Sequence, residues 1–124
     1  MAYELDTFTR AFLNAALWAG TDDTGEPLED RFTLADVADA TVADAVADCA
    51  AFQATHAALL AGADPAQAGH DFYLTRNGHG AGFWDRDVSV YPADPYGTRL
   101  TDAAHGFGTW DFYVGDDGML YHHN

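Results

Sequence analysis

Histidine, carboxylate and guanidinium side chains are densest between residues 70 and 87. Those able to take part in chemistry are His70, Asp71, Arg76, Asn77, His79, Asp85, Arg86 and Asp87. A histidine and a carboxylate that share a cleft can act as general acid and base, or bind a metal ion that activates water. One hypothesis is therefore a small metal-assisted hydrolase centred on His70, Asp71, His79 and Asp85.

The spacing within this segment matches no established ligand pattern such as H-E-x-x-H. A hairpin turn carries polar residues without any catalytic role, and Arg76 and Arg86 are suited to pair with carboxylates at the ends of a hairpin. We therefore favour a structural role for the segment. The preferred interpretation includes no catalytic residue, no metal ion and no cofactor.

Other candidate motifs give weaker signals. The glycines of NGHGAGF, residues 77–83, lack the lysine of a phosphate loop, and GDDG, residues 115–118, lacks the twelve-residue loop of an EF-hand. Cys49 is the single cysteine, which leaves no intrachain disulfide. Its apolar neighbours predict an inert thiol in the core.

The elements that position these residues follow from periodicity. Apolar residues at helical spacing predict a first helix over residues 5–19 with Asp6 as its N-cap. The same spacing predicts a second helix over residues 33–61, started by a capping box of Thr33 and Asp36. Both helices precede the polar segment.

From residue 70 onward, aromatic residues and glycines increase. An Asn77-Gly78 turn between aromatic segments predicts a hairpin of strands 72–75 and 82–84. A short helix over residues 99–107 and a closing hairpin, with strands 110–114 and 119–122, follow. The sequence thus predicts one α+β domain over residues 1–124, with two N-terminal helices, then a small antiparallel sheet of two hairpins and a short intervening helix.

The charge of the chain is strongly one-sided. Twenty acids, 17 of them aspartate, face five arginines and no lysine, and the net charge is -15. Such a surface repels phosphate backbones and anionic lipid, so we expect no direct binding to nucleic acid or to a membrane. Basic proteins are the natural partners. GC-rich coding or adaptation to high salt is the alternative explanation of the same composition.

The chain shows no secretion signal and no apolar run of 18 residues, which predicts a cytoplasmic protein. Two groups of acids are the candidate partner-binding residues. The segment TDDTGEPLED supplies Asp22, Asp23, Glu26, Glu29 and Asp30, and the second helix supplies a stripe of Asp36, Asp39, Asp44 and Asp48. A charged outward face is also common on surface helices, so the stripe alone does not establish a binding site.

Three segments carry a resemblance to a known group of proteins. ALWAGTDDTGEPLEDRF, AGHDFYLTRNGHGAGFWDRD and LTDAAHGFGTWDFYVGDDGMLY together span about half of the chain. They resemble a family of small acidic proteins of bacteriophages and mobile elements, which has no assigned activity. The long alanine and aspartate helix and the residues between Asp87 and Gly97 depart from that pattern. What the resemblance implies is a genetic setting in which acidic proteins occupy the DNA-binding grooves of host enzymes.

A protein that imitates DNA needs a high density of negative charge on its surface. Duplex DNA carries one charge per about 1.7 Å of axis, or roughly one per 100 Å² of surface. A domain of 13.3 kDa exposes about 6,500 Å², which gives its 20 acids roughly one per 300 Å². Mimicry therefore requires the acids to gather on one face.

The sequence favours a non-enzymatic accessory protein that binds a basic surface of a host protein. In its most specific form it is a DNA mimic that inhibits a restriction, CRISPR or DNA-repair enzyme. The alternatives are the metal-assisted hydrolase described above and a structural or assembly protein with a salt-adapted surface.

Overall fold

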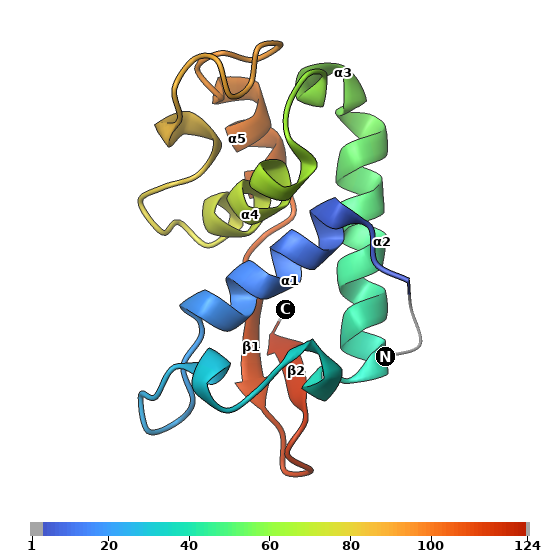
Figure 1. Ribbon diagram of the computed structural model, residues 1–124, viewed down its shortest axis with the longest axis vertical. Coiled ribbons are helices and arrows are strands. Elements are labelled where there is room, and N and C mark those ends of the chain that lie inside the picture. The colour runs from blue at the N-terminus through green and yellow to red at the C-terminus, as the bar shows by residue number, and fades with distance from the viewer. Residues whose placement is uncertain (1–3, 124) are drawn as a thin grey trace.

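The computed structural model describes residues 4–123 and contains five α-helices and one two-stranded antiparallel sheet (Figure 1). The helices are α1 (Thr7–Ala19), α2 (Asp39–Thr55), α3 (Ala57–Leu60), α4 (Pro65–Arg76) and α5 (Thr98–His105). The strands are β1 (Asp111–Val114) and β2 (Leu120–His123), and short 3-10 helices η1 (Leu28–Asp30), η2 (Leu34–Asp36) and η3 (Phe83–Asp85) lie in the connections. The mixed helix and sheet composition confirms the α+β class.

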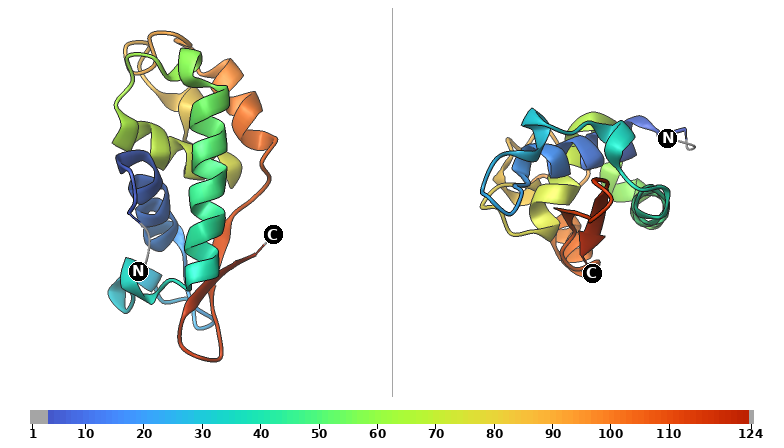
Figure 2. Two further views of the ribbon diagram at one scale, coloured as in Figure 1. Left: turned by 90° about the vertical axis from the view of Figure 1, so that its right-hand side faces the viewer. Right: turned by 90° about the horizontal axis from the view of Figure 1, so that it is seen from below.

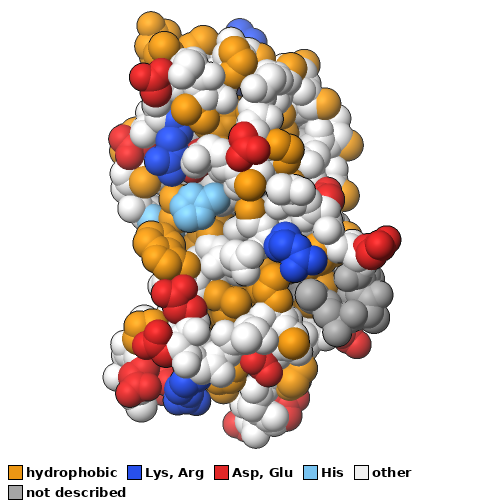
Figure 3. Space-filling model, in the orientation of Figure 1, with side chains coloured by type: hydrophobic (Ala, Val, Ile, Leu, Met, Phe, Trp, Pro, Cys, Tyr) orange, Lys and Arg blue, Asp and Glu red, His pale blue; other side chains and the backbone are white. Residues whose placement is uncertain are grey.

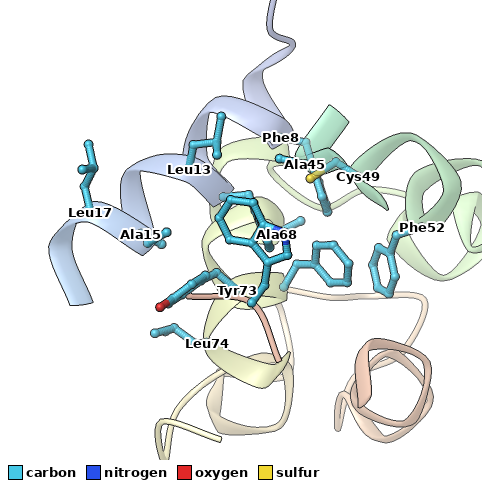
Figure 4. Close-up of a cluster of buried hydrophobic side chains, with 14 of the residues drawn as sticks. Phe8, Leu13, Ala15, Leu17, Ala45, Cys49, Phe52, Ala68, Tyr73 and Leu74 are labelled. Atoms are coloured by element: carbon cyan, nitrogen blue, oxygen red, sulfur yellow. The ribbon is translucent and has the colours of Figure 1, made fainter. Parts of the chain in front are cut away.

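A cluster of aromatic rings at the centre of the molecule joins α1, α2 and α4. Phe52 of α2 stacks on Phe72 of α4 with ring centroids 4.2 Å apart, and Phe12 of α1 meets the edge of Trp110 at 5.1 Å. Figure 4 shows side chains of these helices, among them Phe8, Phe52 and Tyr73, converging on one buried cluster. Burial of these large side chains supplies most of the hydrophobic driving force.

The close approach of α1 and α4 depends on a glycine. A Cβ atom at Gly69 would lie 2.0 Å from the carbonyl oxygen of Phe8, which no real side chain tolerates. Glycine normally weakens a helix interior, so here the packing between the two backbones outweighs its low helix propensity. Helix α1 itself begins where the sequence predicts, because Asp6 accepts a hydrogen bond of 2.8 Å from the backbone N–H of Thr9.

The predicted first hairpin is wrong. Residues 72–75 belong to α4 and residues 83–85 form the 3-10 helix η3, so the sheet consists of a single hairpin. Asp64 caps α4 through the backbone N–H of Gln67 at 3.0 Å, and Pro65 occupies the first helical turn. The aromatic side chains that suggested a strand serve instead to pack one helix against its neighbours.

The predicted second helix is divided into shorter pieces. The capping box of Thr33 and Asp36 is present, but it starts the 3-10 helix η2 rather than α2. The chain then extends at Val37, which forms a parallel bridge with Leu120 of β2, while Ala38 donates to the Leu120 carbonyl at 2.9 Å. This contact with the sheet interrupts the helical pattern and delays α2 until Asp39.

The C-terminal elements agree with the sequence. Helix α5 matches the predicted short helix, and β1 pairs with β2 in the register Phe112 to His122 and Val114 to Leu120. Gly118 at the turn has a φ of 79°, a conformation that favours glycine. Figure 2 shows this hairpin extending to the same end of the molecule as η2 and the beginning of α2.

Replacing Gly69 with alanine tests the contact between α1 and α4. Overpacking usually costs about 1–3 kcal/mol, and here the obstacle is backbone, so this cost exceeds the roughly 1 kcal/mol gained in helix propensity. We expect the free energy of unfolding to fall by about 2 kcal/mol in urea denaturation. Gly106→Ala is the control, because its Cβ meets only the Ala103 oxygen at 3.3 Å. Equal stability of the two variants would contradict the proposed contact.

Candidate functional site

Asp71 is the centre of the predicted polar segment, and it is fully buried. Its carboxylate accepts hydrogen bonds from the Arg86 guanidinium, at 2.6 Å from Nη2 and 3.1 Å from Nε, and from the Tyr91 hydroxyl at 2.5 Å. The Gln67 side-chain amide adds contacts of 3.1 Å. These hydrogen bonds to one carboxylate join α4 to the segment after η3.

The partners of Asp71 are fixed in their protonation states. Burial, with the hydrogen bond to Asp71, raises the pKa of Tyr91 far above its ordinary value, so Tyr91 remains a donor. The hydrogen bond to Asp71 likewise raises the pKa of Arg86. Both groups therefore stay protonated near neutral pH and act as hydrogen-bond donors to the Asp71 carboxylate.

Arg76 and Asn77 also serve the fold. The Arg76 guanidinium pairs with Asp48 of α2 at 2.9 Å, donates to the carbonyls of Gly108 and Phe107 at 2.7 and 3.0 Å, and is only 5% exposed. The Asn77 side chain forms two hydrogen bonds with the backbone of Trp110, one accepted at 2.9 Å and one donated at 3.1 Å. These contacts fix the end of α4 against the chain that enters β1.

The other members of the polar segment do not join Asp71. His70 lies beside Trp18 of α1 with ring centroids 5.9 Å apart, His79 stacks on Tyr73 at 5.7 Å, and Asp85 is exposed on η3. Within residues 4–123, no group of three or more histidine, cysteine, aspartate or glutamate side chains could hold a metal ion. Of the predicted residues, His70 and Arg86 line one hollow together with Gln67, and Arg86 also pairs with Asp71.

The acidic segment 21–30 is folded around one of its own aspartates. Asp22 accepts hydrogen bonds from the backbone N–H groups of Thr24 and Glu26 at 2.8 and 3.0 Å, and pairs with Arg31 at 3.0 Å. The hydrogen bond from the Thr24 hydroxyl contributes most to lowering the pKa of Asp22. With Asp22 holding the loop, the remaining acids of the segment face solvent, namely Asp23, Glu26, Glu29 and Asp30.

The four aspartates of the predicted stripe have different local contacts. Asp36 belongs to the capping box of η2, Asp48 pairs with the buried Arg76, and Asp44 contacts His122 of β2 at 2.7 Å. Asp39 is exposed in the first turn of α2, where the helix dipole favours negative charge. Of the four, only Asp39 makes no side-chain hydrogen bond or ion pair with the part of the chain that the structure describes.

The structure adds acids that sequence reasoning did not assign to the site. A hollow of about 670 Å³ brings Asp23 of the N-terminal loop together with Asp116 and Asp117 of the β1–β2 turn, beside Tyr113 and Tyr121. Asp117 accepts a hydrogen bond of 2.5 Å from the Tyr121 hydroxyl, and this bond is the largest cause that lowers the pKa of Asp117. More than 90 residues separate Asp23 from Asp116 in the chain, so no local pattern could have joined them.

These elements form one end of the molecule, which we call the acidic end and define as residues 22–39 and 115–118. It lies at the bottom of Figure 1, and Figure 2 shows the same grouping from a second direction. It carries one arginine, Arg31, against nine acids, which are Asp22, Asp23, Glu26, Glu29, Asp30, Asp36, Asp39, Asp116 and Asp117. In Figure 3 acidic side chains crowd the lower left of the surface and are more scattered above.

Comparison of the chain with protein-family models, curated proteins and solved structures gives no match. The resemblance to acidic phage proteins therefore stays a prediction. Among residues 4–123, no helix has both the length and the apolar character that crossing a membrane requires.

Replacing Asp71 with alanine tests its structural role. Removing one partner of a buried ion pair costs about 3–5 kcal/mol, and we expect about 3 kcal/mol because water can still reach part of the Arg86 side chain. Urea unfolding followed by tryptophan fluorescence measures the loss. Asp85→Ala is the matched control, since Asp85 is exposed, and its stability should be essentially unchanged. A similar loss in both variants would refute the anchoring role of Asp71.

Cys49 provides a test of core burial. Its thiol is fully buried, and burial raises its pKa to about 12. At pH 8 the thiolate is then roughly one part in ten thousand, so the folded protein should react with a disulfide reagent only as fast as it unfolds. Absorbance of the released thiolate measures this rate, and the protein in concentrated denaturant is the control. Stoichiometric reaction of the folded protein within seconds would be inconsistent with an inert core thiol.

Proposed function

We propose that this chain is a non-enzymatic protein that binds a basic surface of a protein partner through its acidic end. The observation that carries the proposal is the uneven charge of that end, where 22 of the 124 residues hold nine of the 20 acids and one of the five arginines. A surface adapted only to salt would spread its acids more evenly. The segments that form this end are distant in sequence and are brought together by the fold.

The arrangement of the acidic end suits recognition of cations. Asp22 and Asp36 hold the backbone in place, while their neighbours Asp23, Glu26 and Asp30 remain exposed on a loop of defined shape. A loop whose backbone is fixed before binding loses less conformational freedom when a partner arrives. Such a surface also accelerates association with a basic partner and opposes association with phosphate backbones.

The most specific form of the proposal is DNA mimicry, in which the partner surface is the DNA-binding groove of a restriction, CRISPR or repair enzyme. The whole surface of 6372 Å² provides one acid per about 320 Å² for its 20 acids, about a third of the density on DNA. Mimicry therefore depends on the acidic end alone. Competition between this protein and duplex DNA for a captured enzyme distinguishes mimicry from binding to another basic surface.

A pair of triple variants tests the proposed surface. Asp23, Asp30 and Asp116 become asparagine in one variant, and Asp85, Asp87 and Asp102, outside the acidic end, become asparagine in the other. Both variants change the net charge by the same amount. We expect the first to bind a peptide of eight arginines about tenfold more weakly at 0.1 M salt, since three contacts of about 0.5 kcal/mol each are lost, and the second to bind within about twofold of the parent.

Isothermal titration calorimetry at about 0.1 and about 0.5 M salt measures these affinities, and screening should weaken parent binding strongly at the higher salt. The same pair of variants then serves as bait for partner capture from a host lysate. Equal weakening by both triple variants would show that binding follows net charge alone, and it would overturn the assignment of the acidic end as the binding surface.

A further inference from the structure

A groove of about 770 Å³ lies along α1, on the side where η1 and η2 pass the helix. Its lining includes Arg10, Asn14 and Trp18 of α1, Glu29 of η1, and His70 of α4. Arg10, Asn14 and Trp18 are spaced by four residues, so they form one stripe along the helix. In Figure 3 a histidine, exposed hydrophobic side chains and an acidic side chain lie close together on this face.

Trp18 is the most unusual residue of the groove. Its side chain is 58% exposed, whereas Trp110 is 2% exposed in the core. The Trp18 and His70 rings lie side by side with their centroids 5.9 Å apart, so His70 supports the indole from one side. An exposed tryptophan held in a groove is a frequent anchor of protein interfaces, because it offers a large rigid surface at low entropic cost.

The two ends of the groove differ in charge. The Leu28 backbone N–H donates to the Gly20 carbonyl at 3.0 Å, which places η1, and with it Glu29, beside the C-terminal end of α1. Arg10 lies eight residues before Trp18, about 12 Å away along the helix. Glu29 is exposed, and its side chain makes no hydrogen bond or ion pair with residues 4–123. The Trp18 end is therefore both aromatic and anionic.

We infer that this end of the groove anchors an arginine side chain of the partner, with the guanidinium stacked on the Trp18 indole and paired with the Glu29 carboxylate. The inference rests on the proposed function and deepens it by naming the side chain that is recognised. Tryptophan is the best aromatic acceptor for a cation, and the net charge of -15 draws cations toward the surface. Arginine fits better than lysine because its planar guanidinium can stack and donate in a fork at once.

The direct test uses a small probe, N-acetylarginine methylamide, with the corresponding citrulline compound as its uncharged counterpart. Nuclear magnetic resonance of protein with ¹⁵N-labelled tryptophan follows the three indole N–H groups. We expect the arginine probe to shift the Trp18 signal saturably and the citrulline probe to shift it much less, while the Trp110 and Trp84 signals move little. Glu29→Gln should weaken the arginine probe about three- to fivefold, whereas Asp102→Asn, an exposed acid outside both the groove and the acidic end, should not.

A second arm uses the peptide of eight arginines with Trp18→Ala and, as the matched control, Trp84→Ala. Trp84 is 51% exposed and lies outside the groove, so its loss should leave affinity unchanged, while loss of Trp18 should lower it about three- to fivefold. Arginine and citrulline probes that shift Trp18 equally, or peptide binding that is indifferent to both Trp18→Ala and Glu29→Gln, would overturn the inference.

The two proposals fail in different ways. In one outcome, the affinity for the peptide depends on Asp23, Asp30 and Asp116 but not on Trp18 or Glu29. The acidic end then binds the peptide and the groove does not. If the arginine probe shifts Trp18 and the two triple variants bind the peptide equally, the groove holds an arginine and the wider acidic end has no special role.

Discussion

The packing of α1 against α4 is the constraint on which the rest of the structure depends. Gly69 allows the two backbones to meet, and this contact sets the depth at which Phe12 and Phe72 lie. Phe52 of α2 and Trp110 of the chain before β1 then complete the same aromatic cluster. Because the aromatic cluster fixes α2 and the C-terminal chain, it also determines where the loops at the acidic end meet.

Two ion pairs, each with one buried partner, connect this core to the charge of the surface. Arg76 forms an ion pair with Asp48, and Arg86 forms an ion pair with Asp71. Each pair joins segments distant in sequence. Arg76 also lies over the rings of Phe12, Phe72 and Phe107, so burial of its charge is compensated by hydrogen bonds and by aromatic faces. Each pair removes one positive and one negative charge together, and the whole excess of -15 therefore falls on the remaining, mostly exposed groups.

Sequence patterns within a few residues predict those helices and turns that contacts between nearby residues determine. Asp6 as an N-cap, the spacing of apolar residues in α1, and the glycines of the closing turn predicted α1 and the β1–β2 hairpin. The predicted hairpin at Asn77 is wrong because Asp64-Pro65, a helix-start signal, begins a helix that runs through the aromatic segment to Arg76. The grouping of Asp23 with Asp116 has no local signal, because residues more than 90 positions apart are brought together only by tertiary packing.

Glu29 belongs to both the acidic end and the groove. The proposed binding therefore has two physical contributions, which are long-range attraction by the exposed acids and direct contact with the Trp18 indole. The exposed acids act over about 10 Å at ordinary salt, so they mainly affect the rate at which a basic partner arrives. The Trp18 indole acts only at contact, so it affects how long an arginine stays. Salt should therefore slow association more than it speeds dissociation. Under the proposed function, such a surface would attract many basic proteins but would retain those that present an arginine at the groove.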